Sequence, residues 1–216
     1  TLERLSVNYD AANVFRETTK CKVVDFPVDC ELNFIGKYSF YNATALKEIY
    51  IPANLEEFPE THNPNGWDYG CFEGCTSLTK VTFAENSKLK STRNATFKDC
   101  TSLSEITLPD GFEHIDQYAF TNSKVKSLHI PASVTYIGAP ILGGCEIESI
   151  TVDENNERFY IENDALCGRF SDGIVFYNCF STAEKYVVPQ DVTIIAQNAF
   201  DSNKMNLIKY PQNNQR

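Results

Sequence analysis

Eight cysteines and three histidines are the residues of this 216-residue sequence whose side chains most readily perform chemistry. The spacing that comes nearest to a zinc site joins His62, Cys71 and Cys75 as H-x8-C-x3-C. It has no fourth ligand nearby and matches no standard zinc site. Motifs for a Cys–His dyad, a serine nucleophile elbow and a phosphate-binding loop are also absent from the sequence. We therefore expect no catalytic residue, no metal site and no cofactor.

The charge of the chain limits its partners. The formal net charge is −10 and the sequence pI is about 4.8, so the chain repels nucleic acid and anionic lipid surfaces. No stretch approaches the ~18 consecutive apolar residues that a transmembrane helix needs. The sequence predicts a folded protein that binds no nucleic acid and does not insert this segment into a membrane.

The cysteines fall into a pattern once the chain is searched for repeats. Residues 72–84 read FEGCTSLTKVTFA, and residues 97–109 read FKDCTSLSEITLP. Related phrases recur along the chain, and most of their closing positions are 22 or 25 residues apart. The sequence predicts one repeat domain over 1–216, with about eight units of 22–25 residues and insertions near 59–70 and 154–185.

The second half of each phrase predicts a short strand. It reads L-x-x-I-x-I-P, with alternating apolar residues before a proline that cannot donate to a ladder. Such strands stack in parallel, about 4.8 Å apart, and bury one another's inward residues. Because no window has a sustained 3.6-residue stripe, we expect short strands, turns or 3₁₀ pieces on the other face and little helix. The expected core columns are Leu5, Val24, Ile49, Val81, Ile106, Leu128, Ile150, Tyr186 and Ile208; Val7, Phe26, Ile51, Phe83, Leu108, Ile130, Val152, Val188 and Tyr210; and Phe15, Phe40, Phe72, Phe97, Phe120 and Phe200.

This repeat gives most of the cysteines a structural explanation. Five of the eight occupy core positions, namely Cys21, Cys71, Cys75, Cys100 and Cys145. A buried free cysteine behaves as a small hydrophobe, and stacked equivalent side chains point in parallel, which disfavours a Cys75–Cys100 disulfide. Cys167 and Cys179 share an insertion, and a disulfide between them stays an open alternative. The cysteine count therefore indicates no cellular compartment.

The complete unit resembles a known class of repeats. Residues 125–138, VKSLHIPASVTYIG, and residues 186–200, YVVPQDVTIIAQNAF, are similar to the BspA-like leucine-rich repeat, and the resemblance covers nearly the whole chain. It implies a leucine-rich-repeat solenoid with a parallel β-sheet on one face. It also implies a secreted or cell-surface adhesion module without enzymatic activity, whose partner is an extracellular or host protein or a glycan. The alternatives are a structural spacer in a longer repeat array and, least favoured, a hydrolase; we expect a monomer.

Candidate binding residues lie on the outward face of the strands and in one insertion. The outward positions include Tyr50, Thr82, Thr107, His129 and Thr151, although a cross-strand threonine ladder would stabilise the sheet without a ligand. The insertion at 59–70 contains Trp67 and Tyr69, which would either pack on the solenoid edge or act as a recognition hot spot. In the second insertion, GIVFYNCF predicts an additional hairpin strand.

Overall fold

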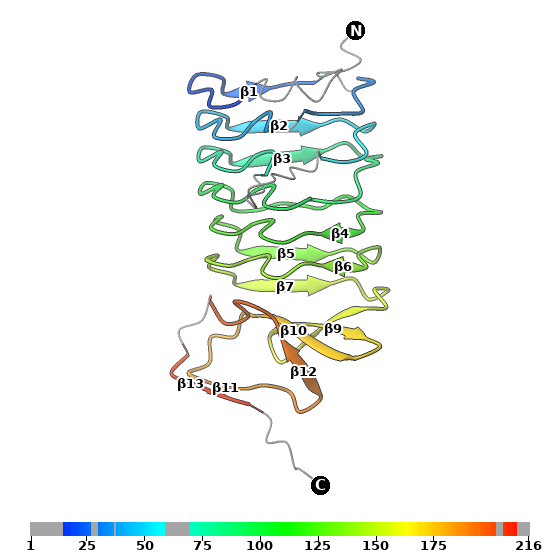
Figure 1. Cartoon of the computed structure of the whole chain (residues 1–216), viewed down its shortest axis with the longest axis vertical. Helices are drawn as coiled ribbons and strands as arrows, with labels where there is room; N and C mark the ends of the chain where they lie inside the picture. Colours follow the sequence, from blue (N-terminus) through cyan, green and yellow to red (C-terminus); the bar gives the residue numbers. More distant parts are fainter. Residues whose placement is uncertain (1–14, 27–29, 37, 59–69, 202–204, 211–216) are drawn as a thin grey trace, which may run out of the picture.

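The computed structural model is a stack of flattened coils along one long axis, with β1 (Val23–Val24) at one end of the stack and β13 (Leu207–Lys209) at the other (Figure 1). The structure describes residues 15–26, 30–36, 38–58, 70–201 and 205–210. These residues contain thirteen strands and no helix, as the sequence predicts, and so no helix that could cross a membrane.

Strands from most of the repeats form the long face of the stack, which we call the strand face. Its strands are β1 (Val23–Val24), β2 (Glu48–Ile51), β3 (Lys80–Phe83), β5 (Ser127–Ile130) and β7 (Ser149–Val152). Paired strands run parallel, with Ile49 beside Val81 and Leu128 beside Ile150. The predicted inward column is buried from Ile49 to Tyr186, because alternate residues of a strand face opposite sides of the sheet.

A second, shorter ladder forms at the other edge of the coils. It consists of β4 (His114–Ile115) and β6 (Tyr136–Ile137), which pair in parallel. Ile115 and Ile137 point into the core, and His114 and Tyr136 are exposed with their rings 5.7 Å apart.

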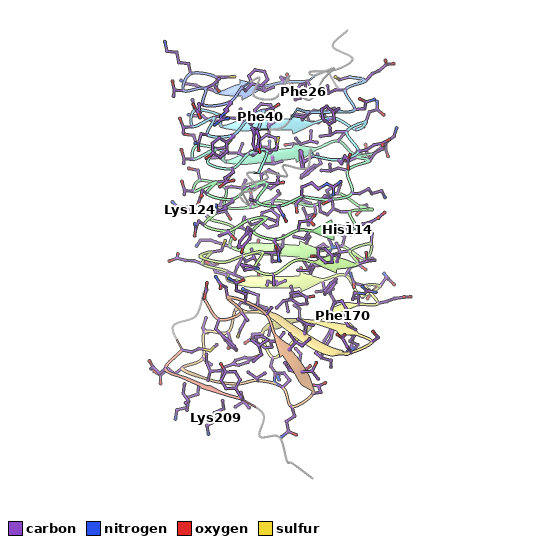
Figure 2. All side chains as sticks on the ribbon, viewed as in Figure 1. Phe26, Phe40, His114, Lys124, Phe170 and Lys209 are labelled. Carbon is purple, nitrogen blue, oxygen red and sulfur yellow. The ribbon has the colours of Figure 1, made fainter. Side chains whose placement is uncertain are left out.

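A column of phenylalanines runs through the core. Ring centroids are 5.0 Å apart between Phe15 and Phe40, 4.9 Å between Phe40 and Phe72, 5.4 Å between Phe72 and Phe97, and 5.9 Å between Phe97 and Phe120. Offset stacking at these distances adds to the hydrophobic gain of burial. Figure 2 shows Phe26 and Phe40 within the stack, whereas Lys124 and Lys209 extend into solvent.

The chain turns sharply two residues after each core phenylalanine or its equivalent. The residues at this position have φ between 53° and 76° and are Glu17, Asn42, Gly74, Asp99, Asn122 and Gly144. Glycine, asparagine and aspartate tolerate this left-handed conformation better than other residues. Their amides donate to the next coil, as in the 2.8 Å bond from Asn42 to the Glu73 carbonyl. The turn thus also joins neighbouring repeats.

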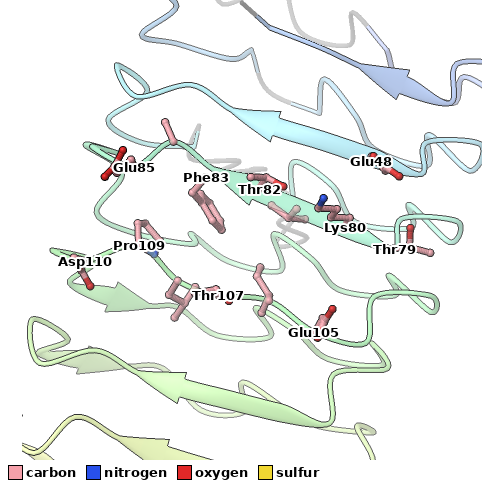
Figure 3. A pocket seen from close by; sticks show the side chains of 14 residues that line it. Glu48, Thr79, Lys80, Thr82, Phe83, Glu85, Glu105, Thr107, Pro109 and Asp110 are labelled. Carbon is pink, nitrogen blue, oxygen red and sulfur yellow. The ribbon is translucent and has the colours of Figure 1, made fainter. Parts of the chain in front are cut away.

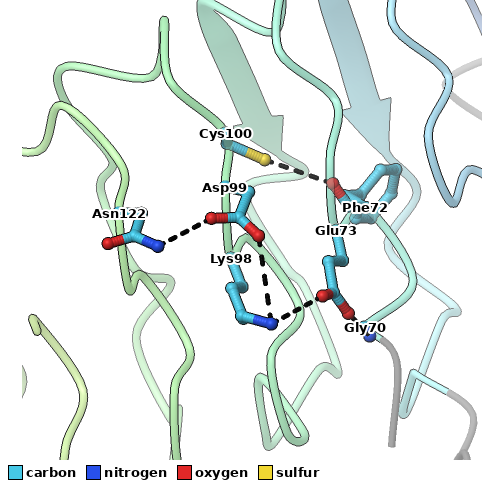
Figure 4. A network of polar contacts seen from close by, with 7 residues as sticks. All are labelled: Gly70, Phe72, Glu73, Lys98, Asp99, Cys100 and Asn122. Carbon is cyan, nitrogen blue, oxygen red and sulfur yellow. Dashed lines mark hydrogen bonds and ion pairs between the residues drawn. The ribbon is translucent and has the colours of Figure 1, made fainter. Parts of the chain in front are cut away.

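One network of hydrogen bonds and ion pairs links three coils at their turns (Figure 4). The largely buried Glu73 accepts hydrogen bonds from the Gly70 amide at 2.9 Å and from Lys98 Nζ at 2.8 Å. Lys98 Nζ is also 3.9 Å from Asp99, which accepts a 2.8 Å hydrogen bond from Asn122 of the next coil. The carboxylate of Glu73 is tolerated inside the protein because it has both partners.

The C-terminal part departs from simple stacking. A four-stranded sheet contains β8 (Phe159–Glu162), β9 (Ala165–Phe170), β10 (Gly173–Cys179) and β12 (Val192–Ile195), in the order β12-β10-β9-β8. Antiparallel pairing of β9 with β10 confirms the predicted hairpin. The parallel pair of β11 (Lys185–Val187) and β13 (Leu207–Lys209) then resumes the repeat, with Tyr186 beside Ile208.

The predicted core columns are wrong in two places. Phe200 does not continue the stack from Phe120; its ring stacks 5.1 Å from Phe176 in a separate cluster, because the hairpin supplies a competing aromatic residue. Tyr210 is 58% exposed rather than inward, since no described strand packs beyond β13. The apolar Ile195 is likewise exposed in β12. Leu2–Asn8, with the predicted core residues Leu5 and Val7, lies outside the described residues.

Candidate functional site

The strand face brings the predicted binding residues together in pairs. Tyr50 lies beside Thr82 in the β2–β3 register, and His129 lies beside Thr151 in the β5–β7 register. His129 Nδ1 is 2.9 Å from Thr151 Oγ1, a contact within hydrogen-bond range. Four of the five residues are exposed and Tyr50 is partly exposed, so all of them reach solvent on one face. Trp67 and Tyr69 lie outside the described residues.

Thr107 lies at a point where the strand face is interrupted, which we call the break in the sheet. The sheet β1-β2-β3 ends at β3, and β5 begins a separate pair with β7. The residues between them, Glu105–Leu108, form no strand and make a single bridge from Glu105 to Ser127. In the described chain, no backbone hydrogen bond joins Glu105–Leu108 to β3. The expectation of a continuous parallel ladder is therefore wrong at this point.

A groove occupies this break (Figure 3). It has a volume of about 620 Å³ and is lined by residues 79–85, residues 105–110 and Glu48. This volume lies in the range of typical ligand pockets, about 300–1,000 Å³. Two predicted binding residues, Thr82 and Thr107, lie on its opposite sides, and we call it the β3 groove.

The hydrophobic core reaches the surface at the floor of the β3 groove. Val81 is 9% and Ile106 7% exposed, whereas their equivalents Ile49, Leu128 and Ile150 are 2–3% exposed. Phe83 is also only partly buried, although Ile51 and Ile130 at the same position are fully buried. The missing strand contacts uncover this apolar surface, so the groove combines an apolar floor with polar walls.

The rim of the β3 groove is acidic. Four carboxylates line it, from Glu48, Glu85, Glu105 and Asp110, with one cation, Lys80. All five side chains are exposed, and within the described chain none of them forms an ion pair. The formal charge of the rim is therefore negative, and it attracts positively charged groups.

A proline helps to explain the break. The residues that close β3 and β7 use their amides to reach the preceding coil: Ala84 donates to the Ile51 carbonyl and Asp153 to the Ile130 carbonyl, both at 3.0 Å. Pro109 holds the equivalent position after Leu108 and has no N–H to donate. The coil that carries Thr107 consequently lacks one of the bonds that draw neighbouring strands together.

The buried cysteines provide no reactive site. No disulfide joins any of the eight, all of which lie among the described residues, so the alternative of a Cys167–Cys179 bridge is not supported. Burial raises the pKa of the Cys75 and Cys167 thiols to about 12, and it raises the pKa of Cys71, Cys100 and Cys145. Because the thiolate is the nucleophile, these side chains are inert at neutral pH.

Metal-ligating side chains do not gather in the described chain. No group of three or more histidine, cysteine, aspartate or glutamate side chains there could hold a metal ion. His62 lies outside the described residues. Among the described residues, the β3 groove offers hydroxyls, carboxylates and an apolar floor, which suit noncovalent binding.

Sequence reasoning identified only two of the polar residues that matter in this groove. It named Thr82 and Thr107 as binding residues and placed Lys80 and Glu105 on the outward face, but it did not identify the rim charges Glu85 and Asp110. One signal marked the position, namely a longer connection after β3, because prolines such as Pro52 and Pro131 also close other strands. Phe83 precedes the next core residue, Leu89, by six positions, whereas the corresponding step from Leu108 to Phe112 is four.

Comparison with known proteins agrees with the repeat architecture. A family model described as the BspA type leucine rich repeat region matches residues 2–62, 68–168 and 172–216, in six copies. A search of the curated proteins found no match.

Solved structures share the fold. A leucine-rich repeat protein from Eubacterium ventriosum has a TM-score of 0.68 and 21% identity, over 84% of this chain and 46% of that chain. A leucine rich cell surface protein from Faecalibacterium prausnitzii has a TM-score of 0.65 and 23% identity, over 88% of this chain and 54% of that chain. The pneumococcal vaccine antigen PcpA has a TM-score of 0.54 and 20% identity, over 89% of this chain and 40% of that chain. The chain thus spans about half the length of the first two structures.

Proposed function

The chain belongs to the BspA type leucine rich repeat family, and from this we propose that it is a non-enzymatic binding module for a protein or glycan at the cell surface. Proteins built from such repeats typically act in protein interaction. Stacked repeats expose an extended surface on which partners bind. The observation that carries the proposal is the β3 groove, where Thr82 and Thr107 face each other over an apolar floor.

The cell-surface location is supported by one protein of similar structure, the leucine rich cell surface protein of Faecalibacterium prausnitzii. We propose that this chain acts outside the cell as a monomer, with an extracellular or host protein or a glycan as its partner. Tyr50, His129 and Thr151 extend the proposed binding surface along the strand face. Trp67 and Tyr69 remain proposed contributors.

Binding arrays test this function. The 216-residue chain is applied to immobilised glycans and extracellular proteins, together with a Thr82→Arg/Thr107→Arg variant that fills the β3 groove. The matched control is Thr101→Arg/Thr135→Arg, at exposed positions that do not line the groove. We expect saturable binding by the wild type and the control, and at least about tenfold weaker binding by the groove variant.

A structural spacer is the second candidate. It is favoured by the stacking of equivalent residues from coil to coil, and by the chain's span of about half the length of similar structures. If the folded chain binds nothing on the arrays, the binding proposal fails and the spacer function is preferred.

A further inference from the structure

The two sides of the β3 groove are unpaired stretches of backbone. β3 is the edge strand of its sheet, and the facing residues Glu105–Leu108 make only the single bridge to Ser127. The backbone amides of Thr107 and Leu108 donate to no partner in the described chain. An unpaired edge of this kind is a template for a strand from another chain.

The side chains along both sides of the groove alternate between outward and core-facing, which is the pattern that an added β-strand can match. In β3, Lys80 and Thr82 point outward while Val81 points to the core, and Glu105, Ile106 and Thr107 repeat this pattern on the other side. An added strand between them would place alternate side chains over the apolar floor and direct the others to the charged rim. Main-chain hydrogen bonds supply affinity in such complexes, and the alternate side-chain positions supply specificity.

The negative charge of the rim favours basic side chains in the added strand. Glu85 and Asp110 lie at one end of the groove, and Glu48 and Glu105 at the other, with Lys80 as the single cation. None of these groups is neutralised by an ion pair within the described chain. Lysine or arginine side chains of a partner complement this rim, and the net charge of −10 speeds the approach of a basic segment.

We propose that the β3 groove accepts an extended segment of a partner polypeptide as an added β-strand, with apolar and basic residues in alternation. This inference rests on the proposed binding function and specifies its partner. It assigns Lys80, Glu105 and Asp110 to recognition, and the free edge of β3 to main-chain pairing.

Three synthetic peptides test the inference with the full 216-residue chain. The first is an acetylated hexapeptide of alternating valine and lysine. The second has glutamate in place of lysine, and the third is the basic peptide with alternate backbone nitrogens methylated, which removes N–H donors and keeps the charge. Fluorescence anisotropy measures affinity, and ¹⁵N NMR shifts of amides in residues 79–85 and 105–110 locate the binding.

Two charge-matched variants accompany the peptides. Glu105→Lys/Asp110→Lys reverses charge in the groove, and Glu154→Lys/Glu157→Lys makes the same change in net charge at exposed positions outside it. We expect the basic peptide to bind the wild type and the control within about twofold, and the groove variant at least about tenfold more weakly. The acidic and methylated peptides should bind at least about tenfold more weakly to the wild type. Melting temperatures confirm that both variants are folded.

The outcomes separate this inference from the general function. Equal affinity for the methylated peptide, equal weakening by both variants, or no binding of the basic peptide overturns strand addition. If the arrays identify a partner whose binding survives Glu105→Lys/Asp110→Lys, the chain is a binding module that does not use this groove as proposed. If the arrays identify no partner but the basic peptide binds as expected, the strand-addition site stands and only the proposed partner classes fail.

Discussion

The thiol of Cys100 donates a hydrogen bond to the backbone carbonyl of Phe72 in the preceding coil, with Sγ 3.2 Å from the oxygen (Figure 4). The same contact recurs at 3.0 Å from Cys75 to Phe40 and from Cys145 to Phe120. A cysteine that fills the core beside the stacked rings therefore also gives a second hydrogen bond to a carbonyl that already accepts one from a backbone amide. These bonds tie the turn of one repeat to the turn before it.

This relationship predicts that Cys100→Ser is tolerated better than Cys100→Val. Serine keeps a donor for the Phe72 carbonyl. Ser123, three residues after Phe120, shows that serine is accepted at the position that Cys100 holds three residues after Phe97. Valine removes the thiol's hydrogen bond, although the Phe72 carbonyl still accepts one from the Cys75 amide at 3.1 Å. We therefore expect a loss of about 0.5–1.5 kcal/mol in the free energy of unfolding. Urea unfolding of both variants measures the difference, and a valine variant as stable as the wild type would show that the thiol acts only by its volume.

Thiol labelling tests the burial of the cysteines. Under native conditions at pH 8, the partly exposed Cys21 and Cys30 should react with a thiol reagent, whereas Cys75, Cys100 and Cys145 should not. Since burial raises the pKa of Cys75 to about 12, its reactivity in the native protein should appear only as the pH approaches that value. Denaturation without reductant should expose all eight thiols; any that stay blocked would indicate disulfides.

Truncation of a central ring tests the aromatic column. Phe97→Ala removes a fully buried ring that stacks on both Phe72 and Phe120. We expect a loss of about 3–5 kcal/mol in the free energy of unfolding, from lost burial and the cavity left behind. Thr107→Ala, at an exposed position, should change stability by less than about 0.5 kcal/mol. A loss below about 1 kcal/mol for Phe97→Ala would contradict the continuous core.

The ion pair between Lys98 and Glu73 should stabilise the turns. Lys98→Met leaves the buried Glu73 carboxylate with only the Gly70 amide, at a cost of about 1–3 kcal/mol. Glu73→Gln in the same chain should recover part of this loss, which a double-mutant cycle measures. Additive single effects would contradict the coupling.

The same pair predicts a loss of stability at alkaline pH. Burial lowers the pKa of Lys98, but the hydrogen bond and charge of Glu73 raise it more, so the pKa lies above its ordinary value of 10.5. A raised folded-state pKa means that this contribution is complete below pH 10.5 and disappears as the pH rises through the folded-state value. The stability difference between wild type and Lys98→Met should therefore shrink above pH 10.5.

A backbone N–H at position 109 should bring residues 105–108 closer to β3. Pro109→Ala provides the N–H that Ala84 and Asp153 use at equivalent positions. We expect the new amide at position 109 to be protected in hydrogen exchange and peptide binding in the β3 groove to weaken. Stability should change by less than about 1 kcal/mol, because the new hydrogen bond is offset by greater freedom of the unfolded chain. Unprotected exchange at this amide would show that another feature keeps the groove open.

Much of the fold follows from periodicity because each repeat must bury its apolar face on the next. The phrases around Phe72 and Phe97 predict equivalent positions, and the rings stack as those positions require. Phe200 occupies the same position in its phrase but packs on Phe176, because an inserted strand lies nearer than the previous repeat. Periodicity identifies the residues that hold equivalent positions in different repeats. It does not show that an inserted strand will pack where the neighbouring repeat is expected.

The candidate site was predictable only in part. Alternation along each strand placed Thr82 and Thr107 on the outward face, and both line the groove. Within the described chain, Thr82 has a strand neighbour on one side, Tyr50, and the β3 groove on the side toward Thr107. Which coils pair depends on hydrogen bonds between them, and these are not visible in the sequence.

The sequence by itself determined the repeat, the absence of long helices, the inward columns and the structural role of the core cysteines, since these follow from the spacing of apolar residues. Only the tertiary structure decided where neighbouring coils pair and where they separate. That outcome depends on small differences between repeats, such as the longer connection after β3. Whether two strands pair depends on the hydrogen bonds that they can form and on the lengths of the connections in both coils. The two coils are about 22–25 residues apart, so no single stretch of sequence contains all of these features.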